Sequence, residues 1–348
     1  MDKIRVALIG LGNMGRNHFR VLNAMPQFDL VAVMDPYAET LPAETEKEIS
    51  LVRSMAELEM IDFAAAIVAS PTETHFQVVK KLLEWDRHVL VEKPAASTYE
   101  QSVELKDLAA HRSLRLCVGN IERSNPAVAA LSRVLDFGVI GTPVHFSATR
   151  AGGFPKSVKP GNHVILDLAV HELDVARKLL GPLQIKHSVC HSTSLHEICD
   201  TAEVLLSNED GITASIHVNW LTPSKIRSLR VTGDLGVCEV DYIAQSCVVS
   251  GHDVSGRIPQ SWGLEVSDDN GFCEKVQIPI ERQEPLMVQL ERFYRWLSGE
   301  DTTDLCFGDA MVESVRLVEE CVNKATSGFD VEAFEILKKG RSVDQPSL

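Results

Sequence analysis

The first 120 residues alternate between short, continuously apolar runs and longer segments in which apolar residues recur every three or four positions. The first pattern is typical of strands buried on both faces, and the second of amphipathic helices. The apolar runs predict strands over residues 3–10, 28–35, 63–70, 87–93 and 114–120, and the periodic segments predict helices over 13–25, 72–85 and 97–111. Strands that alternate with helices predict an α/β fold with a doubly wound parallel sheet, covered on both faces.

The pattern changes after residue 120. Several strands follow one another between about 183 and 280 with short polar turns, which predicts a mostly antiparallel sheet. Helices are predicted over 125–141, 163–181, 285–299 and 308–325, and a strand over 142–150. We therefore expect an N-terminal domain over 1–120, a C-terminal α/β domain on an open sheet over 121–328, and a tail over 329–348.

The sequence predicts four helix ends. Ser97 with Glu100 predicts a capping box, and Thr72 and Asn125 are predicted N-caps. Gly181 is the predicted C′ residue of the helix that begins at 163.

The turn after the first strand reads GLGNMG, from Gly10 to Gly15, and fits the pattern G-x-G-x-x-G. The next strand ends in Asp35, twenty residues after Gly15, as the dinucleotide-binding fingerprint requires. Gly10 permits the tight turn, Gly12 lets the backbone approach a pyrophosphate, and the helix N-terminus offers free N–H groups to it. Asp35 would accept hydrogen bonds from the ribose hydroxyls and repel a 2′-phosphate, which favours NAD over NADP.

Two further segments follow the carboxyl ends of predicted strands, where open α/β sheets bind ligands. SPTETH, residues 70–75, is expected to lie beside the cofactor. VEKPAAS, residues 91–97, places Lys93 at a strand end before Pro94, which restricts the lysine to extended geometry.

His163, Asp167 and His171 are spaced at i, i+4 and i+8, so one helix would carry them on one face. Three interpretations remain open for them: a metal site, polarity without a function, or a catalytic pair in which Asp167 orients His171 as a general base. Asp167 and His171 interrupt an apolar face, which favours the catalytic interpretation slightly.

Composition narrows the class of protein. A net charge of −15 over 348 residues argues against nucleic acid or an anionic membrane as a general partner. The first 20 residues have no signal-peptide layout and no apolar run could cross a bilayer, so we expect a cytoplasmic protein. Eight scattered cysteines without a Cys-x-x-Cys pair are expected to be buried thiols.

Together, GLGNMG, VMD, SPTETH, VEKPAAS and ILDLAVHELD resemble the GFO/IDH/MocA family of NAD(P)-dependent sugar oxidoreductases, over nearly the whole chain. The resemblance implies a Rossmann domain and a second domain whose open sheet commonly mediates homodimers or homotetramers. It also implies a catalytic group of Lys93, Asp167 and His171, with His171 as the base and Lys93 binding the hydroxyl, although the reverse assignment stays open. The implied NAD contacts are Gly10, Gly12, Asn13, Met14, Gly15, Asp35, Ser70, Pro71, Thr72, His75, Glu92 and Lys93.

A narrower resemblance lies in residues 122–131 and 150–174, which look like the nucleotide-sugar 3-dehydrogenases. It implies oxidation of the 3-hydroxyl of UDP-N-acetylglucosamine or its uronic acid. The 3-keto product would feed 3-amino-sugar synthesis for lipid A or surface polysaccharide. A diphosphate substrate needs local cations in an acidic protein, and Arg123 and Arg150 are preferred over Lys156 and Lys159. The predicted substrate contacts are Lys93, Asn120, Glu122, Arg123, Arg150 and His171.

Three alternatives remain. The same catalytic group would serve a dehydrogenase of inositol or another polyol or hexose, in which only the pocket differs. A non-catalytic NAD-binding sensor would have no need of a base beside the nicotinamide. A member that reduces an aldehyde or imine would run the hydride step backward, and Asp35 weakly disfavours it because such reductions more often use NADPH.

Overall fold

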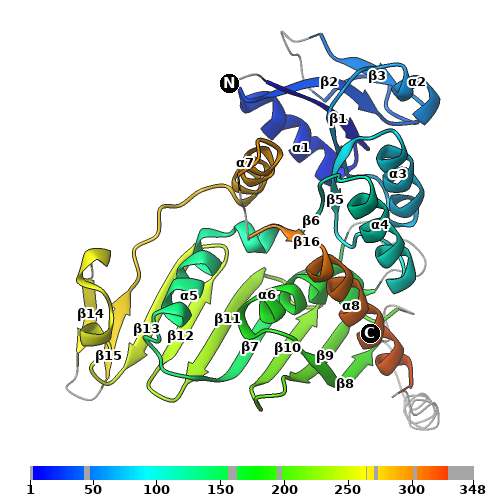
Figure 1. Ribbon diagram of the computed structural model, residues 1–348. Helices are drawn as coiled ribbons and strands as arrows, with labels where there is room; N and C mark the ends of the chain where they lie inside the picture. Colours follow the sequence, from blue (N-terminus) through cyan, green and yellow to red (C-terminus); the bar gives the residue numbers. More distant parts are fainter. Residues whose placement is uncertain are drawn as a thin grey trace, which may run out of the picture.

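The computed structural model describes residues 3–42, 48–155, 163–193, 198–263, 265–269, 273–300 and 304–327. These residues form two sheets with helices packed against them (Figure 1). The tail predicted over 329–348 and the two candidate lysines, Lys156 and Lys159, lie outside the described residues.

The first sheet has the strand order β16-β6-β5-β4-β1-β2-β3. Its strands are β1 (Ile4–Ile9), β2 (Phe28–Met34), β3 (Ser50–Val52), β4 (Ala65–Val68), β5 (His88–Glu92), β6 (Leu116–Gly119) and β16 (Cys306–Phe307). All neighbours are parallel except β16, which runs antiparallel to β6. The five predicted strands are confirmed. β3 and β16 were not predicted, because three and two residues are too short to show a period.

Helices cover both faces of this sheet. One core cluster joins Val6 and Leu8 of β1 to α1 (Asn13–Ala24) and α7 (Pro285–Leu297). A second cluster joins Ala7 and Ile9 to the helices on the other face. Those helices are α3 (Thr72–Glu84), α4 (Tyr99–His111) and α8 (Asp309–Ser327), and the short α2 (Met55–Glu59) follows β3. Because successive residues of β1 enter opposite cores, its sequence is apolar without interruption, and the predicted doubly wound arrangement is confirmed.

The second sheet has the strand order β14-β15-β13-β12-β11-β7-β10-β9-β8. Its strands are β7 (Pro143–Ala151), β8 (Gln184–His191), β9 (Thr201–Ser207), β10 (Thr213–Asn219), β11 (Ile226–Gly233), β12 (Val237–Asp241), β13 (Ser246–Gly251), β14 (Glu265–Asp269) and β15 (Glu274–Gln277). Only the β7–β10 pair is parallel among the strand pairs described, so the prediction of a mostly antiparallel sheet is confirmed.

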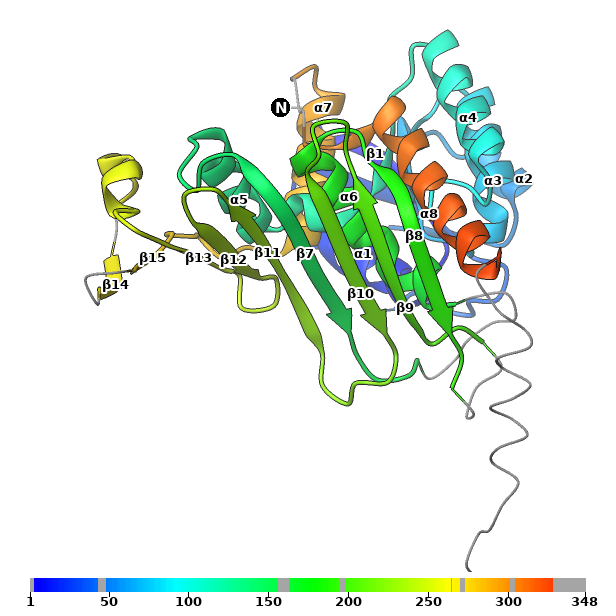
Figure 2. The ribbon, with the colours of Figure 1, turned by 90° about the horizontal axis from the view of Figure 1, so that it is seen from below.

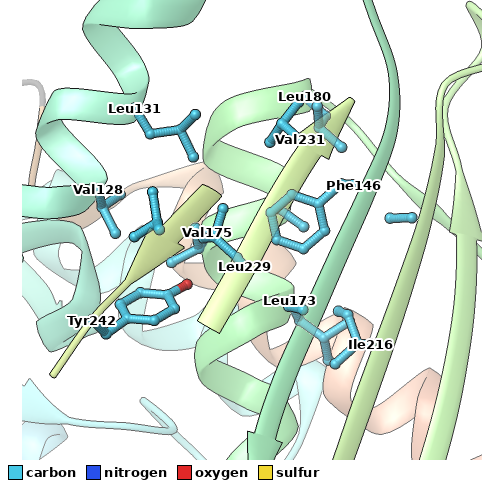
Figure 3. Close-up of a cluster of buried hydrophobic side chains, with 14 of the residues drawn as sticks. Val128, Leu131, Phe146, Leu173, Val175, Leu180, Ile216, Leu229, Val231 and Tyr242 are labelled. Carbon is cyan, nitrogen blue, oxygen red and sulfur yellow. The ribbon is translucent and has the colours of Figure 1, made fainter. Parts of the chain in front are cut away.

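One face of the second sheet carries α5 (Pro126–Asp136), α6 (Val170–Leu180) and part of α8, and Figure 2 shows the other face without a helix in the described part of the chain. Figure 3 shows the core between them, where Val128 and Leu131 of α5 and Leu173 of α6 lie over Phe146 and Leu229 of the sheet. The division at residue 120 stays a prediction, since α7 and β16, which come much later in the chain, join the first sheet.

Two of the four predicted helix ends need correction. The N-cap of α4 is Thr98, whose side chain accepts a hydrogen bond from the Gln101 N–H, so the cap lies one residue after the predicted Ser97–Glu100 box. Thr72 is the first residue of α3 and does not cap it. The other two are confirmed: Asn125 caps α5 through the Ala127 N–H, and Gly181 follows α6 at a φ of +80°.

The prediction of free thiols is wrong at one pair. Cys190 of β8 and Cys199, which precedes β9, form a disulfide. They meet because β8 and β9 are antiparallel neighbours, an arrangement that the sequence spacing did not reveal. Five others, Cys117, Cys238, Cys247, Cys306 and Cys321, are buried free thiols. Among the described residues, no helix is long and apolar enough to cross a membrane.

Candidate functional site

A cavity of about 770 Å³ opens beside the carboxyl ends of β1, β2, β4 and β5. It lies where parallel sheets of this kind bind ligands, because the loops that follow neighbouring strands meet at that edge. Of the residues predicted to contact NAD, those that line it are Gly10, Gly12, Met14, Asp35, Ser70, Pro71, Thr72, His75, Glu92 and Lys93. Asn13 and Gly15 do not line it; Asn13 is the first residue of α1.

The three glycines of the turn have different surroundings. Gly10 has a φ of +95°, and a Cβ there would lie 2.7 Å from the Ala69 carbonyl oxygen. A Cβ on Gly15 would lie 2.0 Å from the Gly10 carbonyl oxygen, so α1 can pack on β1 only with glycine at this position. Around Gly12, by contrast, no described residue other than its two chain neighbours comes within 4 Å of where a Cβ would be. The bare backbone at Gly12 and the N-terminus of α1 therefore fit a bound pyrophosphate.

Asp35 stands at the end of β2 and is held by three backbone N–H groups. Its Oδ2 accepts from Leu11 at 2.7 Å, and its Oδ1 accepts from Tyr37 at 2.9 Å and Ala38 at 3.0 Å. These bonds fix a carboxylate in the cavity wall, where it can accept from the two hydroxyls of an adenosine ribose. A fixed negative charge at this place also repels a 2′-phosphate.

We expect Asp35→Asn to lower the preference for NADH over NADPH by about tenfold or more, because it removes the charge that repels the phosphate and weakens the ribose hydrogen bonds. The amide keeps an acceptor for the Tyr37 and Ala38 N–H groups. The measurement is the dissociation constant of each reduced cofactor, from the quenching of tryptophan fluorescence. Asp29→Asn, on the same strand, is the matched control, and an unchanged NADH-to-NADPH ratio in Asp35→Asn would contradict the assignment.

His75 and Glu92 line the cavity and also hold the backbone on both sides of Lys93 in place. The buried His75 ring has Nδ1 2.8 Å from the Pro94 carbonyl oxygen and Nε2 2.8 Å from the Ser70 carbonyl oxygen. Glu92 lies with its Oε1 2.7 Å from Nε2 of the buried His18, and a Cβ on Gly119 would come within 3.1 Å of the same carboxylate. The residues on both sides of Lys93 are thus fixed from α1, α3 and β6.

Lys93 joins the end of β5 in the first sheet to the turn before α6, a helix that packs on the second sheet. Its Nζ donates to the Asp167 carbonyl oxygen at 2.8 Å and to the Asp167 Oδ1 at 3.3 Å. The other carboxylate oxygen of Asp167 accepts from the Trp220 indole at 3.3 Å. The lysine side chain is 18% exposed, so its ammonium is held at the cavity rather than in open solvent.

Asp167 lies in a π-helical turn, Ile165–Ala169, that leads directly into α6. Such turns are rare and frequently occur at functional sites. The turn is wider than an α-helical one, so the spacing of Asp167 and His171 does not put them in register as a regular α-helix would. The described structure contains no hydrogen bond between the two side chains, and the predicted orientation of His171 by Asp167 is corrected: Asp167 bonds Lys93 and Trp220 instead.

His171 lies in the first turn of α6, and its Nδ1 is buried without a hydrogen-bond partner among the described residues. Burial, and then the positive charges of Arg150, Lys93 and Arg227, hold the pKa of His171 well below its ordinary value. The imidazole is therefore neutral at neutral pH and can accept a proton. Burial also lowers the pKa of His163.

A metal site at His163, Asp167 and His171 finds no support. Within the described ranges there is no group of three or more His, Cys, Asp or Glu side chains that could hold a metal ion.

Arg123 and Arg150 do not fit the predicted contact with a diphosphate. Arg123 is 5% exposed and makes a two-pronged ion pair with Asp174, at 2.7 Å and 2.6 Å. Arg150 is equally buried and donates to Glu172 at 2.5 Å and Glu122 at 2.6 Å. Both guanidinium groups neutralise carboxylates of their own chain, so they hold η1 (Ile121–Ser124) and α6 together.

The two remaining predicted substrate residues, Asn120 and Glu122, lie at the junction of the sheets. Asn120 is buried, donates to the Cys306 sulfur at 3.3 Å, and leaves its Oδ1 without a partner in the described residues. Glu122 accepts from Arg150 and from the Asn125 amide at 3.1 Å. Neither residue lines the cofactor cavity, and their contact with a substrate stays a prediction.

Several site residues had no signal in the sequence. Trp220 follows β10 and Arg227 lies on β11, and each reaches the region of Asp167 only because β7, β10 and β11 are neighbours. His18 comes one turn after the glycine motif and could have been linked to the site by that spacing alone.

Two family profiles match the chain. Residues 4–120 match the profile described as "Oxidoreductase family, NAD-binding Rossmann fold". Residues 128–239 match the "GFO/IDH/MocA C-terminal domain". The predicted cofactor class, NAD, is confirmed by the first match.

Individual proteins are also similar. A UDP-N-acetylglucosamine 3-dehydrogenase of Acidithiobacillus ferrooxidans is 27% identical over 296 residues, which cover 84% of this chain and 88% of that protein. A scyllo-inositol 2-dehydrogenase (NAD(+)) of Bacillus subtilis is 31% identical over 186 residues, 51% of this chain and 54% of that protein. A solved structure of the Acidithiobacillus enzyme superposes with a TM-score of 0.77 at 23% identity, over 92% of this chain and 97% of that one. A 3-ketoreductase from Actinomadura kijaniata, solved with NADP and TDP-benzene, gives 0.76 at 19% identity, over 93% and 98%. The two superpositions confirm the fold.

Proposed function

The chain belongs to the GFO/IDH/MocA family of oxidoreductases, and from this premise we propose that it oxidises the 3-hydroxyl of a UDP-N-acetylglucosamine-type nucleotide sugar to the 3-keto sugar, with NAD⁺ as the oxidant. The product would feed 3-amino-sugar synthesis for lipid A or surface polysaccharide. The observation that carries the proposal is that Lys93 lines the cofactor cavity and also bonds Asp167, in the turn that leads into α6 on the second sheet.

The residues take the following roles. Gly10, Gly12 and Asp35 would hold the cofactor, which when bound accepts a hydride from the alcohol carbon. The neutral His171 accepts the proton of the hydroxyl, as its lowered pKa permits. The Lys93 ammonium donates a hydrogen bond to the oxygen and stabilises the negative charge that develops there. Asp167 holds that ammonium in place and balances its charge.

The choice of substrate is supported by the 27% identity to a UDP-N-acetylglucosamine 3-dehydrogenase over 84% of the chain. The polyol alternative is favoured by the 31% identity to the scyllo-inositol enzyme, which extends over 51% of the chain. The chain contains Lys93, Asp167 and His171, which argues against a non-catalytic NAD-binding sensor, because a sensor would have no need of a base beside the nicotinamide.

The test is the absorbance of NADH formed from NAD⁺ with UDP-N-acetylglucosamine, its uronic acid or myo-inositol. Each assay also contains a coupled aminotransferase with L-glutamate as the amino donor, so that any 3-keto sugar is converted to the 3-amino sugar and does not accumulate. Turnover of a UDP-sugar supports the proposal. Turnover of inositol with neither UDP-sugar active would contradict it and leave the family assignment in place.

We further propose that the protein works in the cytoplasm as a homodimer or homotetramer that self-associates through the open face of the second sheet. Val189 of β8 and Leu205 of β9 support this, because each is nearly half exposed, at 47% and 48%, on that face.

A further inference from the structure

Arg227 is the second residue of β11 and faces the helix-covered side of the sheet. It lies directly opposite Arg150 of β7 in the antiparallel pair. Leu229 and Val231, two and four residues later, are buried in the core on the same side. Arg227 itself is only half-buried, so its guanidinium lies where the core meets the site.

One edge of this guanidinium is fixed and the other is available. Nη1 donates to the Ala151 carbonyl oxygen at 2.6 Å and to the Ile226 carbonyl oxygen at 2.9 Å. Nε and Nη2 make no hydrogen bond with any described residue, and Arg227 has no ion pair within that part of the chain. Arg123 uses this same Nε–Nη2 edge to bind both oxygens of Asp174. The available edge of Arg227 thus has the geometry that binds a carboxylate or phosphate with two parallel bonds.

The surrounding charges do not fully compensate Arg227. Its pKa is lowered, first by burial and then by the positive charge of Arg150, in spite of nearby Glu172, Glu122 and Asp167. Both glutamates are already engaged: Glu172 by Arg150 and the Tyr242 hydroxyl, and Glu122 by Arg150 and Asn125. A buried or half-buried cation without an engaged anion is costly, and an anionic ligand would remove that cost.

The available edge faces the region of the reacting groups. Nη2 would lie 3.9 Å from a Cβ on Gly152, whose N–H donates to the Asn219 carbonyl oxygen. Trp220, which follows Asn219 in the chain, donates to Asp167 and packs edge-on against Phe154. Arg227 is also close enough to His171 for its charge to act on the imidazole.

We propose that the Nε–Nη2 edge of Arg227 binds an anionic group of the substrate, the role that the sequence assigned to Arg123 and Arg150. This inference rests on the proposed function for the identity of the substrate. Two sources share the chemistry: the diphosphate of the nucleotide, and the C6 carboxylate of a uronic acid.

The test is calorimetric titration of NAD⁺-saturated protein with UDP-N-acetylglucosamine, its uronic acid, inorganic pyrophosphate and D-glucuronate, at low ionic strength. The variants are Arg227→Gln and Arg227→Lys, which keeps the charge but not the two-pronged edge. Arg5→Gln is the control, because Arg5 pairs with Asp62 near the start of β1, at the opposite end of that strand from the cavity. Thermal melting shows whether each variant is folded.

We expect Arg227→Gln to weaken binding by about 10- to 100-fold, as for a hydrogen bond to a charged group, with a smaller loss in Arg227→Lys and none in Arg5→Gln. A loss for both UDP-sugars and pyrophosphate assigns the diphosphate. A loss only for the uronic acid and glucuronate assigns the carboxylate. Equal binding of all four ligands by wild type and Arg227→Gln overturns the inference. If wild type binds neither UDP-sugar, the proposed function fails, and the titrations with pyrophosphate and glucuronate alone test the role of Arg227. Binding of either ligand by wild type that is lost in Arg227→Gln supports the inference. Binding of neither ligand by wild type overturns it.

Discussion

Replacing Lys93 with methionine is expected to lower kcat by about a thousandfold or more while leaving the protein folded. The ammonium is the only charged donor that the described structure brings to both the cofactor cavity and Asp167. Removing one donor that stabilises a developing oxyanion typically costs about 10²- to 10³-fold, and loss of proton management adds to this. Methionine preserves the length of the apolar stem, so the loss reports on the charge.

The measurement is kcat and KM for the substrate identified by the NADH assay, beside cofactor binding. Lys80→Met is the matched control, because Lys80 pairs with Glu104 on the surface between α3 and α4. Lys93→Arg should recover little, since a planar guanidinium cannot occupy the position of a compact ammonium. A Lys93→Met protein that binds NAD⁺ and retains more than about a tenth of wild-type kcat would remove Lys93 from the mechanism.

Replacing His171 with asparagine is expected to lower kcat/KM by about 10²- to 10⁴-fold, the usual contribution of a general base. The pH profile separates this role from a structural one. Because burial and three nearby cations lower the pKa of His171, the base stays unprotonated as pH falls through 6.5. The acid limb of wild-type kcat/KM should therefore lie below the ordinary histidine value, and His171→Asn should lack it.

His163→Asn is the control, because burial alone lowers the pKa of His163, whereas the charge of Lys93 also acts on His171. An acid limb that persists unchanged in His171→Asn would assign the base to another group.

The thermal stability of the protein gives an independent readout of the lowered histidine pKa values. His88, His163 and His171 all have lowered pKa values, so the unfolded chain binds more protons than the folded one below pH 6.5. Melting temperature should fall as pH drops below that value, and by less in His171→Asn.

The buried ion pairs explain why Arg123 and Arg150 do not fit the predicted contact with a phosphate. Arg123 and Arg150 lie in segments rich in charge, and their positions in the sequence do not show whether each side chain faces the protein interior or a bound ligand. Asp174 and Glu172 are 51 and 22 residues away from them, and their positions on α6 bring carboxylates to both arginines. An arginine that is fully engaged in this way specifies the packing of α6 and cannot also bind a ligand without leaving a buried carboxylate unpaired.

The sequence by itself determined most of the fold and the cofactor end of the site. The apolar runs of β1, β2, β4, β5 and β6 and the periodic helices depend on consecutive residues, and so do the glycine turn, Asp35 and the cap at Asn125. Local backbone geometry and side-chain period decide such features, and both can be read from neighbouring positions. The position of Lys93 at a strand end can likewise be read from the residues next to it.

Only the tertiary structure decided the partners. In the structure Asp167 bonds Lys93 and Trp220 rather than His171, and Cys190 forms a disulfide with Cys199. The edge strand β16 comes from residues 306–307, and one edge of the Arg227 guanidinium stays available. The contacts of Lys93, Trp220, β16 and Arg227 join segments far apart in the chain. Cys190 and Cys199 are only nine residues apart, but they meet through the pairing of β8 with β9, which their spacing does not show. The energy of a charged or polar contact is set by the position and burial of both groups, and sequence spacing fixes neither.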